Sequence, residues 1–350
     1  MGKAVSGSYG DHYFNTPVLQ SPGPVPLSIM TETNQSSLLR NLKRIPGVSV
    51  KTSEPLARYT SMKVGGPADY FCEVEDVSAL AALLQLLRRE DVPVCLLGNG
   101  SNVLVSDAGV RGAVIHLAGS FKRAEWRQEG EAAWVDVGAA YLVARLAREA
   151  ARRGYAGLEF AEGIPGSMGG ALVMNAGAYG SEFERIVEQV DGVTAGGQFV
   201  RLARSELNFG YRRSDLPTGM VVTGIRLRLE KADPLEVSRS LEEMVTKRKK
   251  AQPSGFPNSG SMFRNPPGDF AGRLIEAAGL KGKRLGQAQI SERHANFIVN
   301  HGGARAEEVR QLIELARAEV DKQFGVRLEP EVRFLGEWGS SGLLTRTGIT

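Results

Sequence analysis

The sequence predicts an α+β fold with more than one domain. Strand-like and helix-like segments are mixed without the strict alternation of a doubly wound parallel sheet. The chain of 350 residues is long enough for two or three domains, and its 42% hydrophobic and 23% charged residues are typical of a globular protein. Glycine contributes 42 residues, which favours ligand sites built from loops.

Composition restricts the class of partner. The net charge of +4 suits a small anionic ligand as well as a polyanion, so it does not by itself indicate nucleic acid. Cys72 and Cys95 are far apart without a CxxC motif, and the four histidines lack metal-ligand spacing. We therefore expect no disulfide framework and no metal site. No apolar run approaches the length of a membrane span, so we expect a cytoplasmic protein without a membrane partner.

Local signals predict the elements in order. Residues 1–36 are rich in Ser, Gly, Pro, Thr and Asn and are expected to be a tail, with folded sequence beginning near Leu38. Gly154 is expected to end a helix as its C-cap. Helices are predicted at 77–89, 141–153, 234–250, 270–278 and 306–324. Strands are predicted within 64–74 and at 92–97, 103–105, 113–117, 133–137, 188–194, 198–202, 220–229, 295–299 and 331–335.

Two glycine-rich stretches are the main candidates for a ligand site. Glu162–Gly180 holds six glycines, and Gly98–Asn102 follows a predicted buried strand. Backbone N–H groups in such loops can hold anions, although a tight structural turn is the alternative. A Walker loop would need a lysine after its last glycine, and Pro165 occupies the first glycine of a nucleophile elbow. Gly98–Asn102 does not match a Rossmann fingerprint, because the third glycine is missing and a predicted strand follows.

Three further motifs carry side chains suited to chemistry on an anion. Arg212 is the first of an arginine pair, and a guanidinium matches a carboxylate or phosphate. Ser261, between a glycine and an apolar pair, is either a turn residue or a hydroxyl that points into a site. Glu331 begins a short apolar strand and shares a face with Arg333, where a surface ion pair is the alternative. Each motif taken alone is more often structural.

The order of these motifs resembles that of the UDP-N-acetylenolpyruvoylglucosamine reductases, flavoenzymes of bacterial cell-wall synthesis. The resemblance extends over about 38–336, nearly the whole predicted folded chain. The combination of GSxFxNP with GIPGxxGG and PEVR is highly specific. The matching series reads GNGSN, GIPGSMGG, NAGAYG, FGYR, GSMFRNP, HANFIVN and LEPEVRF.

The resemblance implies an FAD-binding unit of the vanillyl-alcohol-oxidase (PCMH) type at 38–230, in two parts at about 38–117 and 118–230. An α+β substrate-binding domain would follow at 231–337, and 338–350 would be a tail. The pyrophosphate of FAD would lie on the amides of Gly98, Asn99, Gly100, Ser101 and Asn102. The isoalloxazine would lie against Gly163, Ile164, Pro165, Gly166, Ser167 and Gly169, with Arg333 facing it.

By the same resemblance, Arg212, Ser261 and Glu331 match the catalytic positions of the family. NADPH would reduce FAD and leave, after which hydride would pass to the enolpyruvyl group of UDP-N-acetylglucosamine enolpyruvate, giving UDP-N-acetylmuramate for peptidoglycan. Arg212 is suited to stabilise the resulting enolate. Glu331 would help to bind and polarise the substrate carboxylate, so we expect its pKa to be raised. Ser261 would protonate the carbanion.

Substrate contacts follow from the same comparison of motifs. The implied residues are Tyr179, Tyr211, Arg248, Lys250, Asn265 and His294. Arg248 and Lys250 lie where the family has basic groups near the UDP diphosphate. Two positions depart from some members of the family: Ala251 stands where they have a lysine, and His294 stands where they have a glutamine. The chain between Arg212 and Ser261 lacks a tyrosine-bearing insertion, which indicates the shorter, second type, in which another group must close the substrate pocket.

Two alternative functions predict features that this sequence does not show. An FAD-dependent sugar or alcohol oxidase of the same superfamily predicts a covalent flavin link, but His116 and Cys95 are not in a linkage motif. A nucleic-acid-binding protein would need basic residues interleaved with exposed aromatics. The one basic cluster is Lys247–Lys250, and aromatic residues make up 7% of the chain. We therefore expect no nucleic-acid partner, and a monomeric enzyme.

Overall fold

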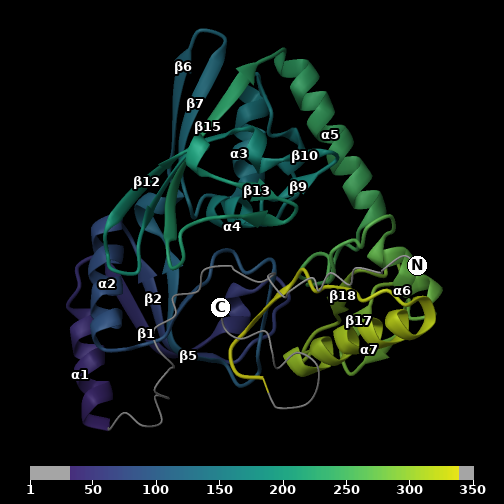
Figure 1. Ribbon diagram of the computed structural model, residues 1–350, viewed down its shortest axis with the longest axis horizontal. Helices are drawn as coiled ribbons and strands as arrows, with labels where there is room; N and C mark the ends of the chain where they lie inside the picture. The colour runs from purple at the N-terminus through teal and green to yellow at the C-terminus, as the bar shows by residue number, and fades with distance from the viewer. Residues whose placement is uncertain (1–31, 339–350) are drawn as a thin grey trace, which may run out of the picture.

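The first part of the molecule is a four-stranded sheet with helices beside it (Figure 1). The computed structural model describes residues 32–338. The elements of this part are α1 (Glu32–Lys43), β1 (Val48–Pro55), β2 (Pro67–Val74), α2 (Val77–Arg89), β3 (Val94–Leu96) and β5 (Val110–Leu117). The strand order is β1-β2-β5-β3, with β1 antiparallel to β2 and with β2 and β3 parallel to β5.

Helix α2 has the predicted bounds, whereas α1 is a correction. The tail expected at 1–36 is wrong for its last five residues, because α1 begins at Glu32. Leu38 and Leu42, four residues apart on α1, are buried in the main core. This packing stabilises a helix whose polar sequence gives little local signal. The rest of the two expected tails, residues 1–31 and 339–350, lies outside the described residues.

The second part is a larger antiparallel sheet. Its elements are β6 (Ala124–Glu129), β7 (Ala132–Gly138), α3 (Val143–Arg153), β8 (Tyr155–Ala156), α4 (Met168–Val173), β11 (Val187–Val193), β12 (Phe199–Ala203) and β15 (Val221–Lys231). The strand order is β12-β11-β15-β7-β6, with β8 also pairing with β15. The predicted hairpin is the β11–β12 pair, and Gly154 ends α3 in the left-handed conformation with φ 74°.

Helix α5 (Pro234–Ala251) extends from the second part to the third (Figure 1). Its N-cap is Asp233, whose carboxylate accepts a hydrogen bond from the Leu235 amide at 2.8 Å. Val237 and Leu241 are buried in the same core as α3. The first turns of α5 therefore pack with the second part, and its last turn carries the basic residues towards the third.

The third part has a core of its own. Its elements are α6 (Ala271–Ala277), β16 (Arg284–Leu285), β17 (Ala288–Ile290), β18 (Ile298–Asn300), α7 (Ala306–Phe324) and β19 (Arg333–Leu335). Helix α7 has the predicted bounds, whereas β18 is shorter than the predicted 295–299 strand. Met62, Val64 and Leu104 from the first part complete this core. The helices within 32–338 lack the length and apolarity needed for a membrane span.

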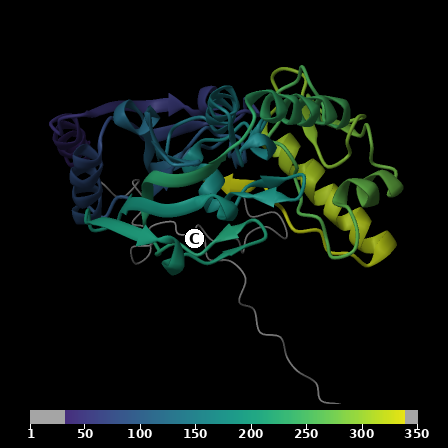
Figure 2. The same cartoon turned by 90° about the horizontal axis from the view of Figure 1, so that it is seen from above.

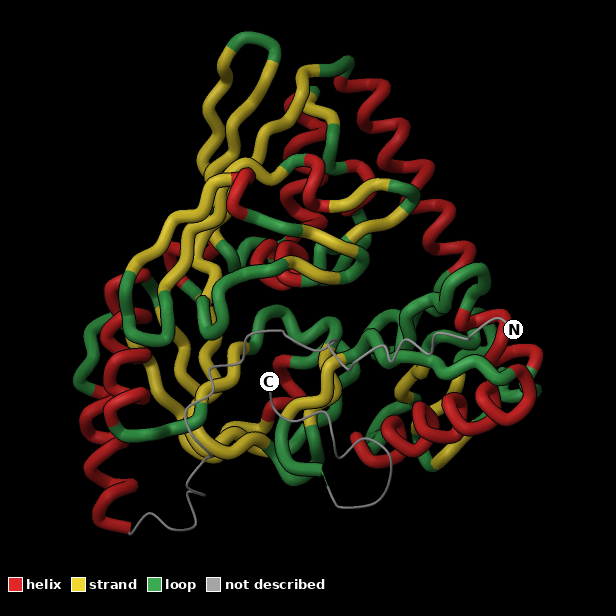
Figure 3. Tube along the Cα trace, viewed as in Figure 1, coloured by secondary structure: helices red, strands yellow, loops and turns green. Residues whose placement is uncertain are grey.

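The C-terminal strand joins the third part to the first. Strand β19 pairs in parallel with β4 (Val103–Val105), which places Arg333 beside Val103. Figure 2 shows the yellow arrow of β19 extending from the third part towards the middle of the molecule. Long loops, green in Figure 3, lie where the two sheets and the third part face one another. Most predicted site residues belong to these loops.

Candidate active site

The two glycine-rich loops lie against each other. The Asn99 side-chain amide donates to the carbonyl of Pro165, and a Cβ at Gly98 would lie only 2.8 Å from Ser167 Oγ. The second loop is held from behind by the segment that precedes α3. The bonds are Val143 N to Gly166 O at 3.1 Å, Met168 N to Tyr141 O at 2.9 Å and Gly169 N to Ala139 O at 2.8 Å. The structure therefore brings together the two loops that the sequence singled out.

The first loop offers a row of backbone donors. Within residues 32–338, no protein group accepts a hydrogen bond from the backbone N–H of residues 98–102. Such amides normally pair, and successive free N–H groups form a concave site for anions. Gly100 is required because φ is +61° and an added Cβ would lie 2.0 Å from the Tyr59 carbonyl oxygen. The donor set fits a pyrophosphate such as that of FAD.

Arg333 lies between the elements that carry these loops. Its backbone N–H donates to Asn102 O at 3.0 Å, and its Nη2 donates to the thioether sulfur of Met174 at 3.2 Å. Burial, together with repulsion from Arg264, lowers the pKa of Arg333 to about 10. It remains protonated at neutral pH, and no carboxylate of the described chain pairs with it. An unneutralised guanidinium at this place suits an electron-rich or anionic ligand beside the loops.

Arg212 and Glu331 form a mostly buried ion pair. Arg212 Nε lies 2.9 Å from Glu331 Oε1, and the two side chains are 20% and 16% exposed. Burial raises the pKa of the Glu331 carboxyl, while Arg212 and Arg264 oppose the rise. The predicted direction of this pKa shift is confirmed. Arg212 has φ +57°, a left-handed conformation that is uncommon for non-glycine residues.

The hairpin that carries Arg212 is anchored to the end of α4. This hairpin consists of β13 (Phe209–Gly210) and β14 (Arg213–Ser214). The side chain of Asn175, which is fully buried, donates to Gly210 O at 3.2 Å and accepts from Glu184 N at 3.0 Å. Ser214 Oγ donates to Val173 O at 3.1 Å. Asn175 was not predicted as a site residue, because its bond to Gly210 joins it to a segment far away in the chain.

The segment that contains Ser261 is joined to the Glu331 segment by backbone hydrogen bonds. Met262 O accepts a hydrogen bond from Glu331 N at 2.8 Å, and Ser261 pairs with Phe297 in an isolated β-bridge. The three predicted catalytic residues thus come from three segments that meet here. Asn296, also missed by sequence analysis, fixes this segment because its side chain bonds both the N–H and the carbonyl of Phe263, at 2.9 and 2.8 Å.

Four of the predicted substrate residues surround this centre or lie on α5. The Arg212 guanidinium lies 5.0 Å from the ring centre of the half-exposed Tyr211. The Arg248 side chain packs on Gly163, where an added Cβ would lie 2.8 Å from its Cδ, and burial lowers the Arg248 pKa. Tyr179 donates to Met244 O of α5 at 3.2 Å. Lys250 is exposed.

The other two, Asn265 and His294, lie together at the start of α6. Asn265 Oδ1 accepts from Ala271 N at 3.1 Å. His294 Nδ1 accepts a hydrogen bond from Asn296 N at 3.2 Å. Its ring packs against Gly272, and a Cβ added to Gly272 would lie 2.8 Å from His294 Cε1. Burial lowers the pKa of His294. Both side chains therefore have structural contacts within the third part, and within residues 32–338 no hydrogen bond or ion pair joins them to Arg212 or Glu331.

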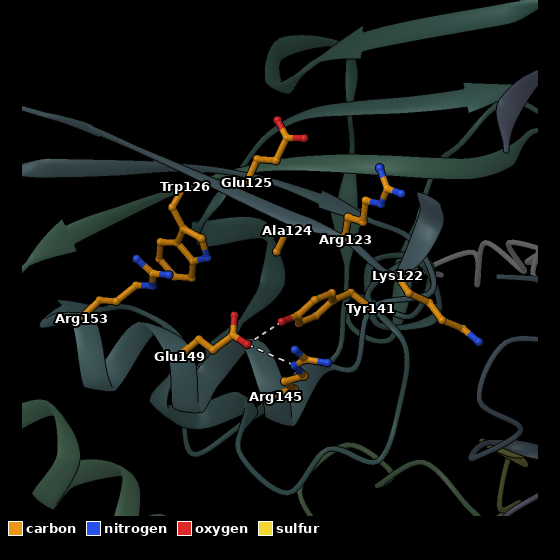
Figure 4. A pocket seen from close by; sticks show the side chains of 9 residues that line it. All are labelled: Lys122, Arg123, Ala124, Glu125, Trp126, Tyr141, Arg145, Glu149 and Arg153. Atoms are coloured by element: carbon orange, nitrogen blue, oxygen red, sulfur yellow. Dashed lines mark hydrogen bonds and ion pairs between the residues drawn. The ribbon is translucent and has the colours of Figure 1, made fainter. Parts of the chain in front are cut away.

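A separate pocket of about 380 Å³ lies between β6 and α3 (Figure 4). Arg153 lies over the Trp126 ring at 4.8 Å, and Tyr141 donates to Glu149 at 2.6 Å. Burial and this carboxylate raise the pKa of Tyr141 to about 12. None of the predicted site residues lines this pocket.

Comparison with known proteins identifies the family. Residues 252–335 match the C-terminal domain of UDP-N-acetylenolpyruvoylglucosamine reductase, and residues 68–203 match an FAD binding domain. The reductase 2 of Symbiobacterium thermophilum is 46% identical over 85% of this chain and 96% of its own length. The reductase of Rubrobacter xylanophilus is 47% identical over 83% of this chain and 96% of its own.

Structural comparison leads to the same family. The crystal structure of the reductase from Thermus caldophilus is similar with a TM-score of 0.71 and 41% identity, over 82% of this chain and 99% of that one. The α+β class and the FAD-binding part predicted from the sequence are confirmed. The free amides of residues 98–102 and the uncompensated Arg333 suit the cofactor that such a domain binds. The chain belongs to the UDP-N-acetylenolpyruvoylglucosamine reductases and is an FAD-containing oxidoreductase.

Proposed function

We propose that this protein reduces the enolpyruvyl group of UDP-N-acetylenolpyruvoylglucosamine to give UDP-N-acetylmuramate, with NADPH as reductant, during peptidoglycan precursor synthesis. It is assigned to the shorter, second type of the family. The observation that carries the proposal is the mostly buried Arg212–Glu331 pair, together with the bond from Glu331 N–H to the carbonyl of Met262, the residue that follows Ser261. The names of its relatives support the substrate class.

FAD is held by the two glycine-rich loops. The amides of Gly98–Asn102 would bind its pyrophosphate, and residues 163–169 together with Arg333 would hold its ring system. When bound, FAD supplies the hydride-transfer chemistry. The chain supplies the position of the ring and a positive charge beside it, since Arg333 is protonated and unpaired with any carboxylate of the described residues.

Arg212 and Glu331 act on the substrate carboxylate. Hydride addition to the enolpyruvyl group develops negative charge on the neighbouring carbon and its carboxylate. A guanidinium already fixed by a 2.9 Å bond to Glu331 stabilises that charge without reorganising in the reaction. Because the pKa of Glu331 is raised, its carboxyl group is more readily protonated and can donate to the substrate carboxylate.

Ser261 donates the final proton to carbon. Serine is a weak acid, so this role requires a strongly basic intermediate and a hydroxyl held in place. The backbone bond from Glu331 to Met262 and the clamp on Phe263 by Asn296 support such fixation. The hydroxyl of Ser261 has no hydrogen-bond partner among the described residues and is free to face a substrate.

The remaining residues bind the nucleotide sugar. Arg248, beside Gly163, and the exposed Lys250 contribute positive charge for the UDP diphosphate. Tyr179, Tyr211, Asn265 and His294 complete the proposed substrate site. We assign 38–230 to FAD binding and 231–337 to substrate binding, in a monomeric enzyme.

The test separates the two half-reactions by stopped-flow absorbance of the flavin. Ser261→Ala is expected to leave flavin reduction by NADPH within about twofold, while reoxidation by the enolpyruvyl sugar nucleotide slows by roughly 10²-fold or more. The matched control is Ser259→Ala, because that hydroxyl instead donates to Val103 O at 3.2 Å. Equal loss in both half-reactions would refute the role of Ser261. Purified protein without flavin absorbance, or reoxidation by oxygen alone, would refute the reductase assignment.

A further inference from the structure

Arg333 has an unusual partner for a partly buried guanidinium. Its Nη2 donates to Met174 Sδ at 3.2 Å, and this is its one side-chain hydrogen bond within residues 32–338. A thioether sulfur is a weak, uncharged acceptor. By contrast, the buried Arg310 meets two carboxylates, Glu307 and Glu314. Arg333 is therefore oriented, but its charge is not neutralised.

The position of Met174 is set by the same helix that follows the second glycine loop. Met174 is the C-cap of α4, and its N–H donates to Gly170 O at 3.2 Å. The next residue, Asn175, is fully buried and hydrogen-bonded on both sides of its amide. The backbone of Met174 is thus held at a defined place relative to residues 163–169, and the Arg333 backbone is held by Asn102 of the first loop, so their side chains meet between two anchored segments.

We propose that Met174 is a positioning residue for the flavin site. Its thioether holds the Arg333 guanidinium beside the end of α4, the helix that follows the second glycine loop, and leaves its full positive charge for the flavin ring. A carboxylate at this position would hold Arg333 equally well but would cancel the charge, whereas a hydrocarbon would leave the guanidinium unanchored. This inference rests on the proposed placement of the flavin beside Arg333.

The physical consequence concerns the reduction potential. A positive charge beside the ring favours the electron-rich reduced cofactor over the oxidised one, which makes reduction easier. Because the site is buried, the interaction is screened less than it would be at the surface. The neutral acceptor therefore serves both cofactor affinity and redox chemistry.

Three substitutions test the proposal in the holoenzyme. Met174→Glu is expected to pair with Arg333, shift the flavin midpoint potential to more negative values and slow reduction by NADPH by roughly tenfold or more. Met174→Leu keeps volume but loses the acceptor, and is expected to weaken FAD binding by roughly three- to tenfold. Met174→Gln offers a neutral acceptor and is expected to restore both properties to within about twofold of wild type. Met220→Leu, a buried core substitution elsewhere, is the control.

The measurements are the midpoint potential by dye equilibration and the FAD dissociation constant by titration of deflavinated protein. Wild-type values in both Met174→Glu and Met174→Leu would overturn the inference. Arg333→Gln tests the placement of the flavin beside Arg333 separately from the role of Met174. If it shifts the potential while the Met174 variants do not, only the role of Met174 fails. If Arg333→Gln has no effect, the flavin placement fails, and the role of Met174 fails with it.

Discussion

Arginines on the outer face of the large sheet differ from those in the candidate active site. On the sheet, Arg226 and Arg127 share Asp136, and Arg201 forms two bonds to Asp191. In the site, Arg212 pairs with Glu331 and Arg264 lies 3.9 Å from Glu329, whereas Arg333 meets only a sulfur. The three sheet arginines are therefore all ion-paired, whereas Arg333, beside which the flavin is proposed to bind, has no carboxylate partner among the described residues. Uncompensated charge, rather than arginine itself, marks the site.

The largest expected effect comes from removing Arg212. Arg212→Ala should slow reoxidation of the reduced flavin by the sugar nucleotide by about 10²- to 10³-fold, because one preorganised charge donor is lost. The matched control is Arg213→Ala, since this exposed neighbour pairs with Asp215 at 3.2 Å. Similar losses in the two variants, measured by single-turnover absorbance, would remove the distinction between site and surface arginines.

A glycine pair tests the backbone half of the site. Gly100→Ala and Gly130→Ala both place alanine at positive φ, near +60°, but only Gly100 has a backbone oxygen 2.0 Å from the added Cβ. Gly100→Ala should displace the loop and weaken FAD binding by roughly tenfold or more, an effect beyond the shared strain of about 1–2 kcal/mol. Equal FAD affinities in the two variants would show that the loop amides do not hold the cofactor.

The two regions should show opposite pH dependence of stability. Hydrogen bonds from Arg226 and Arg127 outweigh burial and lower the pKa of Asp136, so its stabilisation exists above the unfolded pKa and is lost as pH falls through the folded one. Burial raises the pKa of Glu331, so its contribution is largest below the unfolded pKa and is lost as pH rises through the folded one.

Denaturant unfolding of Asp136→Asn and Glu331→Gln between pH 3 and 8 measures this contrast. The deficit of Asp136→Asn relative to wild type should be about 1 kcal/mol at neutral pH and should shrink in acid. As the pH falls, the unfolding free energy of the wild type should increase relative to that of Glu331→Gln. Parallel curves for the two variants would contradict the assigned pKa directions.

The smallest effect is expected at Arg201, which is 57% exposed and whose pKa is raised by Asp191. Arg201→Gln should leave both half-reactions unchanged and shift the melting temperature only slightly, with even that shift reduced at high salt. A large change in flavin chemistry would show that the outer sheet face communicates with the site.

Local signals predicted the elements whose ends are decided locally. The apolar spacing of α2 and α7 and the left-handed Gly154 needed no distant partner. Helix α1 was missed because its stability comes from burying Leu38 and Leu42 against the main core. For Arg212, Ser261 and Glu331, motif order rather than spacing allowed prediction, and the structure brings their segments together.

Sequence analysis did not identify the residues that hold the site segments in place. Met174, Asn175 and Asn296 act through contacts with residues far away in the chain, so no local pattern distinguishes them from ordinary loop residues. Asn265 and His294 show the converse: their motif match is clear, but their contacts lie within the third part. The substrate roles of these two residues stay predictions.

The parallel pairing of β19 with β4 has a consequence for synthesis in the cell. Translation produces the glycine loops and Arg212 long before the closing strand, which carries Arg333 and follows directly after Glu331. A chain that ends before this strand lacks Arg333 and the pairing that joins the third part to β4. By the proposed roles of Arg333 and Glu331, products of translation interrupted before Glu331 are expected to lack redox activity.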